Sequence, residues 1–411
     1  MQSSTEYRQN LAWLYGLQKF GIKLGLENMH RLIEALGLSL PIAPKVIHVA
    51  GTNGKGSVCA MIESICRAEG LQTGLFTSPH LVTFRERIQS NGALISEDDA
   101  GNGISEIREL VGQWDPHPTF FEVVTALTLK HFNIRKVDVA VLETGLGGRL
   151  DATNAVSSSV AVITPIDLDH QKWLGNTIEQ IASEKAGIIK PKTPVVSSPQ
   201  HLAAEEVLRT RAAECDAPIE FVTESYNRTP VGLRGVHQKQ NAAVAIAAVQ
   251  AANIGLTDPA VARGLMSVEW PARFQKWDDQ IIIDGAHNPA AANVLAATWR
   301  EIFGEQTATL ILGVLADKDA TGICQALAPI AEQIILPPIR SERGMPPEQL
   351  AKICRSIAPQ LPHSITPSIE EAISRARANP SPILLTGSLH FAGDALAFLQ
   401  GRPNAFEECN Q

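Results

Sequence analysis

Residues 45–57 read Lys45-Val46-Ile47-His48-Val49-Ala50-Gly51-Thr52-Asn53-Gly54-Lys55-Gly56-Ser57. The apolar run 46–50 predicts a buried strand, and a helical pattern opens at Ser57 and extends to Gly70. The glycines between them let backbone N–H groups approach an anion, and Lys55 adds a full positive charge. Because the N-terminus of a helix also favours anions, the stretch predicts a nucleotide-binding loop over residues 52–57.

The match to the common nucleotide-loop pattern, GxxxxGK[ST], is incomplete. Val49 stands where that pattern has its first glycine, and Gly56 stands where it has a hydroxyl, so that Ser57 comes one residue late. A glycine-rich turn that binds nothing is the alternative interpretation. The predicted strand before the loop and the predicted helix after it favour phosphate binding.

The size and composition of the chain indicate a two-domain globular protein. At 411 residues it is too long for one ordinary core, and 45% of its residues are hydrophobic and 19% charged. The net charge of −8 argues against nucleic-acid binding, and no apolar run approaches the ~20 residues of a membrane span. The six cysteines form no CxxC pair and the polar N-terminus lacks a signal-peptide core, so we expect reduced thiols and a cytoplasmic location.

Polar side chains follow three further predicted strands, at the points where these strands end. Glu143 follows the continuous apolar run 137–142, and burying an unpaired acid there would be costly, which favours a cation-binding role. Ser78 follows another short strand, where its hydroxyl suits either Mg²⁺ or a simple turn. His170 comes shortly after a third strand and is either a structural hydrogen-bond donor or a ligand. Since ligands bind at the carboxyl ends of parallel strands, these side chains form a candidate metal site.

A second series of alternating strands and helices begins after the sequence Glu269-Trp270-Pro271-Ala272-Arg273-Phe274. We therefore expect a domain of residues 1–273 and a smaller domain of residues 274–411, each an α/β unit with a mostly parallel sheet covered on both faces. In the second domain, Asp284 and His287 follow a predicted strand, which again places them on the ligand side of a sheet.

The motifs together resemble those of a known family. GTNGKGS is similar to the nucleotide loop of the Mur ligase superfamily. VIHVAGTNGKGSVCAMIE and ETGLGGRLDATN resemble signatures of its folate branch, the folylpolyglutamate synthases and dihydrofolate synthases. TSPHL, TFFE and DGAHNP are weaker matches in the expected order, so the resemblance spans nearly the whole chain. It implies a Mur ligase-like α/β fold, with an N-terminal P-loop ATPase domain and a smaller C-terminal Rossmann-like domain.

The resemblance also implies roles for individual residues. The implied catalytic residues are Lys55, Lys185 and His287. The implied metal ligands are Ser78, Glu143, His170 and Lys185, the last as a carbamate formed with CO₂. The implied ATP contacts are Thr52, Asn53, Gly54, Lys55, Gly56, Ser57, Asn241, Arg273 and Asp284. The implied pterin-side residues are Thr119, Phe120, Phe121, Glu122, Leu150, Asp151 and Ala152. For Asn241, a role as the N-cap of a helix is equally natural.

Two positions depart from the family pattern. Ala272 stands where the family usually has glycine, so the turn before Arg273 is expected to differ slightly. Gln171 stands where many relatives have threonine, which leaves the neighbouring ligand His170 in place.

The activity that the resemblance implies is an ATP-dependent ligation. A carboxylate would attack the γ-phosphate of ATP to form an acyl phosphate, and the amine of L-glutamate would then displace phosphate. The acceptor would be dihydropteroate, the γ-carboxyl of folate or both. The cofactors would be ATP and one or two Mg²⁺. The enzyme would be a monomer that acts on small molecules. The alternatives are a Mur-type UDP-muramoyl ligase, against which TFFE and ETGLGGRLDATN argue, and a nucleotide-binding module without ligation, against which DGAHNP argues.

Overall fold

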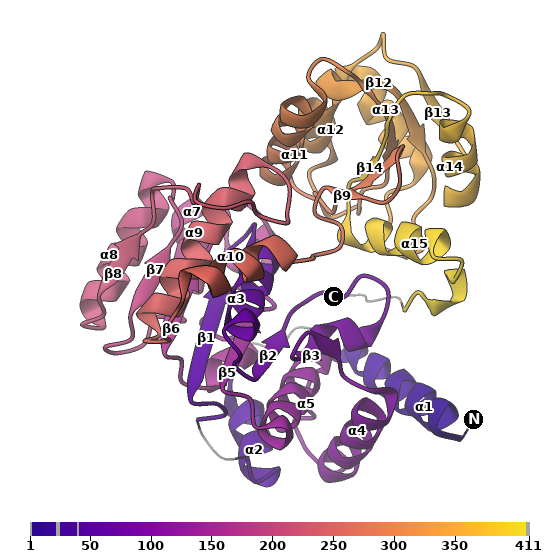
Figure 1. Ribbon diagram of the computed structural model, residues 1–411. Helices are drawn as coiled ribbons and strands as arrows, with labels where there is room; N and C mark the ends of the chain where they lie inside the picture. Colours follow the sequence, from indigo (N-terminus) through magenta and orange to yellow (C-terminus); the bar gives the residue numbers. More distant parts are fainter. Residues whose placement is uncertain (1, 22–24, 39–40, 408–411) are drawn as a thin grey trace.

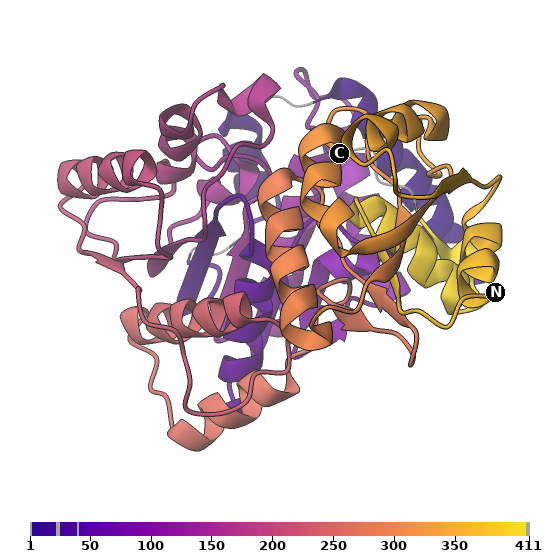
Figure 2. The same cartoon turned by 90° about the horizontal axis from the view of Figure 1, so that it is seen from above.

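The computed structural model describes residues 2–21, 25–38 and 41–407. Within these residues the strands form two sheets, one of eight strands and one of six, and helices cover both sheets (Figure 1). We call the elements around the eight-stranded sheet the first domain and those around the six-stranded sheet the second domain. In the view from above, the orange and yellow second domain lies against one side of the first (Figure 2).

The first sheet has the order β4-β3-β2-β5-β1-β6-β7-β8. Its strands are β1 (Lys45–Ala50), β2 (Thr73–Phe76), β3 (Ile88–Ser90), β4 (Ala93–Leu94), β5 (Val139–Glu143), β6 (Val160–Ile163), β7 (Val195–Ser197) and β8 (Ile219–Phe221). β1 pairs in parallel with β5 and β6, so that Val49 lies opposite Glu143 and Ala50 opposite Ile163. The loops after these three strands therefore leave the sheet at one edge, which is where the sequence places its polar motifs.

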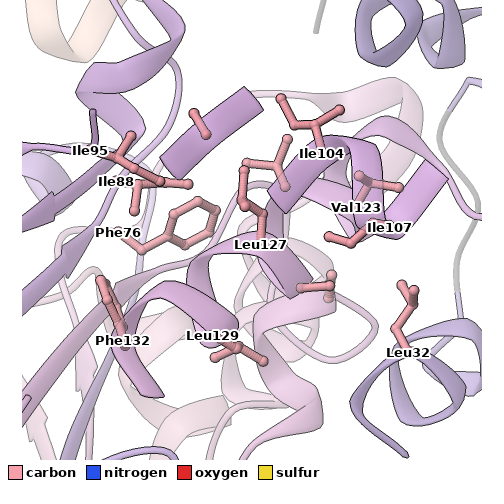
Figure 3. Close-up of a cluster of buried hydrophobic side chains, with 14 of the residues drawn as sticks. Leu32, Phe76, Ile88, Ile95, Ile104, Ile107, Val123, Leu127, Leu129 and Phe132 are labelled. Carbon is pink, nitrogen blue, oxygen red and sulfur yellow. The ribbon is translucent and has the colours of Figure 1, made fainter. Parts of the chain in front are cut away.

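Alternating residues of the central strands face two separate cores. Ile47 and Val49 pack under α3 (Lys55–Ala68), α9 (Val236–Ala251) and α10 (Asp258–Ser267). Val46 faces the other core, which α1 (Gln2–Gly16), α2 (Glu27–Ala35), α4 (Glu97–Val111) and α5 (Phe120–Arg135) complete. Figure 3 shows this second core, in which Phe76 and Ile88 from the sheet gather with Leu127 from α5. Further along the sheet, α7 (Ile178–Ala186) and α8 (Leu202–Glu214) bury a third cluster.

The second sheet has the order β13-β12-β11-β14-β10-β9 and is parallel except for β9. Its strands are β9 (Gln275–Lys276), β10 (Ile281–Ile283), β11 (Ala308–Leu312), β12 (Ala331–Leu336), β13 (His363–Ile365) and β14 (Ile383–Thr386). α11 (Pro289–Phe303), α12 (Ala320–Leu327) and α13 (Pro347–Ile357) pack on one face. α14 (Ile369–Arg377) and α15 (Leu389–Leu399) pack on the other. The short elements are η1 (Leu17–Phe20), η2 (Phe84–Arg87), η3 (Ala152–Ala155), α6 (Gln171–Leu174), η4 (Ala328–Ile330) and η5 (Pro403–Ala405).

This architecture confirms the expected fold class, two α/β units with mostly parallel sheets. Two local predictions were wrong. The helix that follows the predicted nucleotide loop, α3, begins at Lys55 rather than Ser57, because Gly54 is its N-cap with φ +85°. Asn241 is not an N-cap, because α9 begins at Val236 and Asn241 lies inside it. The domain boundary between Arg273 and Phe274 stays a prediction.

Some expectations concern features that the structure describes only in part. Cys59, Cys66, Cys215, Cys324 and Cys354 are buried and free, as expected, and Cys409 lies outside the described residues. In the described part of the chain, no helix is long and apolar enough to cross a membrane.

Candidate active site

A cavity of about 350 Å³ lies where the two domains meet. The first domain lines it with the loop after β1 and with side chains beyond β2, β5 and β6, and the second domain lines it with residues before and after β10. The predicted site residues on its wall are Thr52, Asn53, Gly54, Lys55, Gly56, Ser57, Ser78, Glu143, His170, Lys185, Asn241, Arg273, Asp284 and His287. The cavity therefore brings together every predicted nucleotide, metal and catalytic residue.

The loop after β1 has the geometry of a phosphate cradle. Its lysine, Lys55, donates to the carbonyl oxygens of Gly51 and Thr52, each at 3.2 Å. Asn241 faces the loop, because a Cβ built on Gly54 would lie 3.2 Å from its Oδ1. These contacts hold the backbone in a turn whose N–H groups belong to the first turn of α3.

Trp270 packs closely against Gly56 of the loop. A Cβ on Gly56 would lie 2.8 Å from the indole nitrogen of Trp270. A side chain at position 56 would force the Trp270 ring to shift, which favours glycine at this position. Sequence reasoning did not connect these residues, because they are separated by most of the first domain.

Glu143 and Ser78 meet beside this loop. The backbone N–H of Ser78 donates to Glu143 Oε2 at 3.2 Å. Burial raises the pKa of the Glu143 carboxyl, and the positive charge of Lys55 opposes that rise. A buried carboxylate with a nearby hydroxyl is an oxygen-rich site of the kind that a hard dication prefers.

His170 and Lys185 complete the predicted metal side of the cavity. Desolvation at the cavity wall and then the charge of Lys318 lower the pKa of His170 to about 4, although its side chain is 41% exposed, so its imidazole is neutral at pH 7 and keeps a free lone pair. The Lys185 amine donates to the Gly51 carbonyl at 2.7 Å. Burial and then the charge of Lys55 lower the pKa of Lys185 to about 7.

The donor set fits a Mg²⁺ ion that is also held by its nucleotide. Among residues 2–21, 25–38 and 41–407, no group of three or more His, Cys, Asp or Glu side chains is placed to hold a metal. Glu143 and His170 would need additional oxygen ligands, from Ser78, from phosphates and from water. Mg²⁺ is commonly bound in this way, with one or two carboxylates and the remaining positions taken by phosphate and water.

A polar network that the sequence did not reveal joins the two domains across the cavity. Lys318 Nζ lies 2.5 Å from Asp169 Oδ1, and both side chains are buried. Asn288 Nδ2 donates to Asp169 Oδ2 at 3.3 Å and to Asn53 Oδ1 at 3.0 Å. Burial by itself would raise the pKa of Asp169, but the neighbouring positive groups His287, His170 and Lys318 hold it well below its usual range. The first-domain loop after β6 is thus tied to the second domain.

Asp284 organises the connection between the domains. Its carboxylate accepts hydrogen bonds from the backbone N–H groups of Phe274 and Ala286, each at 2.8 Å. Burial raises the pKa of Asp284, and the adjacent Arg273 opposes this rise. The Arg273 guanidinium lies on the cavity wall, where it can reach an anion.

The predicted pterin-side residues lie outside this cavity, in the first domain. Glu122 and Thr119 form a capping box at the start of α5, with the Glu122 carboxylate 2.7 Å from the Thr119 nitrogen. Asp151 accepts from the backbone N–H groups of Gly145, Leu146 and Thr153, at 2.9, 2.9 and 3.0 Å. Both carboxylates therefore shape the local backbone.

The remaining pterin-side residues differ in how exposed they are. Phe121 and Leu150 are half-buried, whereas Phe120 and Ala152 are buried. Phe120 stacks on Tyr15, with 5.7 Å between ring centroids.

A nucleotide loop that faces an acid and a histidine of a second α/β domain is the arrangement of a Mur-type ligase. The family model for the Mur ligase middle domain matches residues 49–196, and the model for the Mur ligase glutamate ligase domain matches residues 272–389. The dihydrofolate synthase/folylpolyglutamate synthase of Bacillus subtilis is 34% identical, over 95% of this chain and 98% of its own length.

Two solved structures extend this similarity to the fold. The Mycobacterium tuberculosis folylpolyglutamate synthase complexed with ADP has a TM-score of 0.89 and 32% identity, over 97% of this chain and 99% of that one. The Yersinia pestis folylpolyglutamate synthase/dihydrofolate synthase complexed with AMPPNP and Mn ion has a TM-score of 0.86 and 33% identity, over 95% and 98% of the chains. The chain belongs to the dihydrofolate synthase/folylpolyglutamate synthase family of Mur ligases. It is a ligase that uses a nucleotide and a divalent metal, as the resemblance implied.

Proposed function

We propose that the protein joins L-glutamate to dihydropteroate, to the γ-carboxyl of folate, or to both, and that ATP drives the reaction. The observation that carries this proposal is the shared cavity, where Lys55 and Glu143 face Asp284 and His287 of the second domain. The acceptor carboxylate attacks the γ-phosphorus of ATP, and ADP leaves. The glutamate amine then attacks the acyl carbon, the C–O bond to phosphate breaks, and the amine proton is released.

The chain's own residues address the charge problem of this reaction, because an anionic acceptor must approach an anionic phosphate. Lys55 and Arg273 both line the cavity, and their positive charges would neutralise the phosphoryl oxygens. Mg²⁺ would be held by Ser78, Glu143 and His170, and when bound it adds positive charge at the phosphates. The closed contact between the domains would exclude water, which otherwise hydrolyses an acyl phosphate.

We further propose that Lys185 is carbamylated. Its amine is buried and its pKa is lowered to about 7, so a large share is neutral at physiological pH. The neutral amine attacks CO₂, an N–C bond forms and one proton is released. The product is a carboxylate-like group at the cavity wall, and it would serve as an oxygen ligand for the metal.

The acceptor side is proposed to lie at Phe121 and Leu150, the half-buried members of the predicted pterin group. The capping box of Thr119 and Glu122 fixes the backbone beside Phe121. The contact between Asp151 and the Gly145 N–H fixes the backbone beside Leu150. We also propose that a cytoplasmic monomer acts on these small molecules, since both walls of the cavity come from one chain.

The first experiment measures ADP release with ATP, Mg²⁺ and L-glutamate, and compares dihydropteroate with tetrahydrofolate. Turnover with both acceptors indicates a bifunctional synthase, and turnover with one assigns the single activity. A UDP-muramoyl acceptor is the control for the cell-wall alternative. If the rate of ADP release does not depend on the acceptor or on glutamate, the protein is a nucleotide-binding module without ligation and the proposal fails.

A further inference from the structure

The loop that follows the predicted metal ligand Ser78 is held by the second domain. Val82 of this loop is buried in the second domain's core, in the cluster that contains Ile281, Ile283 and Phe391. Gly393 of α15 touches the same loop, because a Cβ at that position would lie 2.0 Å from the Leu81 carbonyl oxygen. In Figure 1, α15 is the yellow helix on the side of the second domain that faces the first. The loop, residues 80–84, is therefore packed against the second domain, while Phe84 at its end lies in the first domain's core.

The segment after α15 adds a specific polar contact to this packing. Glu407 Oε2 accepts from the Phe84 backbone nitrogen at 2.5 Å and from Thr83 Oγ1 at 3.2 Å. The Glu407 backbone nitrogen also donates to the Val82 carbonyl at 2.9 Å. The Glu86 carboxylate accepts from the backbone N–H groups of Leu81, Val82 and Thr83. The next backbone N–H, that of Phe84, donates to Glu407 instead.

His80 connects this contact to the first domain. Its Nδ1 accepts from Arg87 Nε at 2.8 Å, which places the ring proton on Nε2, and Nε2 lies 2.8 Å from the Glu407 carbonyl oxygen. The Tyr15 hydroxyl lies 3.4 Å from the same Nε2, and Tyr15 stacks on Phe120. Two residues before His80, Ser78 donates its N–H to Glu143. One loop thus connects the second domain, the predicted metal ligands and the predicted acceptor side.

We propose that Glu407 is a positioning residue for ligation, which holds loop 80–84 on the second domain and thereby sets Ser78 against Glu143. Phe406 supports it by packing edge-on against His390, with 4.9 Å between ring centroids. The inference rests on the proposed function, because it assumes that Ser78 and Glu143 hold the metal. Glu407 does not line the cavity, so it acts on the metal only through the loop.

The test uses the full chain and measures Mn²⁺ affinity in the presence of AMPPNP by calorimetry. Glu407→Ala is expected to weaken Mn²⁺ binding about 10- to 100-fold, as for other residues that orient metal ligands. Glu407→Gln keeps an acceptor oxygen and is expected to stay within about threefold of the wild type. AMPPNP affinity without metal should change less than about twofold in both variants, and hydrogen exchange at amides 80–87 should rise only in Glu407→Ala.

A second variant reaches the same contact from the helix side. Gly393→Ala pushes α15 from the loop and should weaken Mn²⁺ binding in the same direction. The controls are exposed Glu305→Ala, and Gly255→Ala, whose Cβ would meet nothing within 4 Å. Unchanged Mn²⁺ affinity in Glu407→Ala, or an equal loss in Glu407→Gln and the controls, overturns the inference. ADP release by the wild type, measured in parallel, tests the proposed function separately.

Discussion

The buried ion pair between Asp169 and Lys318 is predicted to hold the two domains in the arrangement that closes the active site. The paired atoms are 2.5 Å apart, and the side chains are only 7% and 8% exposed. Lys318→Met would leave Asp169 with Asn288 at 3.3 Å and His287 at 3.6 Å, but without its closest cation. Removing one partner of a buried ion pair destabilises the state that contains it by about 3–5 kcal/mol, because the other charge stays buried without compensation. Because Asp169 keeps these two partners and also the His170 backbone N–H at 2.8 Å, and because the domains can part to admit water, we expect the lower figure.

Losing about 3 kcal/mol from the closed arrangement that the reaction requires corresponds to a fall in kcat/KM on the order of 100-fold. The assay is steady-state ADP release by the wild type, Lys318→Met, Asp169→Asn and the double variant. If the two residues act as a pair, the double variant should be less impaired than the sum of the single variants, by at least about 1.5 kcal/mol. The matched control is Lys276→Met, which removes an exposed ion pair with Asp279 and should change kcat/KM less than about threefold. Single-variant effects that add within about 0.5 kcal/mol would refute the reasoning.

Three further predictions concern the cavity and the connection between domains. Glu143→Ala should abolish Mg²⁺-dependent turnover and leave the unfolding temperature within about 3 °C of the wild type; full activity would remove the metal assignment. Because the pKa of Lys185 is about 7, bicarbonate should restore the activity of CO₂-depleted enzyme more effectively at pH 8 than at pH 6, where the amine is protonated, and Lys185→Gln should not respond. Ala272→Gly should raise the free energy of unfolding by up to about 1 kcal/mol, since relief of the +56° φ (about 1–2 kcal/mol) exceeds the loss of the buried methyl (about 0.8 kcal/mol); a decrease in a denaturant titration would contradict this.

The sequence predicted the cavity's wall because of a property of parallel sheets. Carboxyl ends of neighbouring strands meet at one edge, so the loop at Lys55, the acid Glu143 and the imidazole of His170 could be placed together from strand ends alone. The resemblance added Lys185, which lies on a helix where local pattern gives no reason to expect a buried amine. It also placed Asp151 against the pterin, and the structure engages that carboxylate with three backbone N–H groups. A contact of this kind depends on the conformation of a loop, and residue type alone does not specify it.

The contacts between domains could not be predicted, and the reason lies in the short connection between them. Ala272 and Phe274 both have positive φ, +56° and +44°, in residues that ordinarily avoid that region. These angles set the direction in which the chain enters the second sheet, and they are held by Asp284, which accepts from the Phe274 nitrogen. Every pairing across the interface, including Lys318 with Asp169, depends on that direction. Local sequence patterns do not specify this direction, so the residues that join the domains are recognised only when the conformation of residues 272–274 is known. Ala272 adopts this left-handed φ with strain that a glycine would not have, which is why the stability of Ala272→Gly also tests how the domains are set.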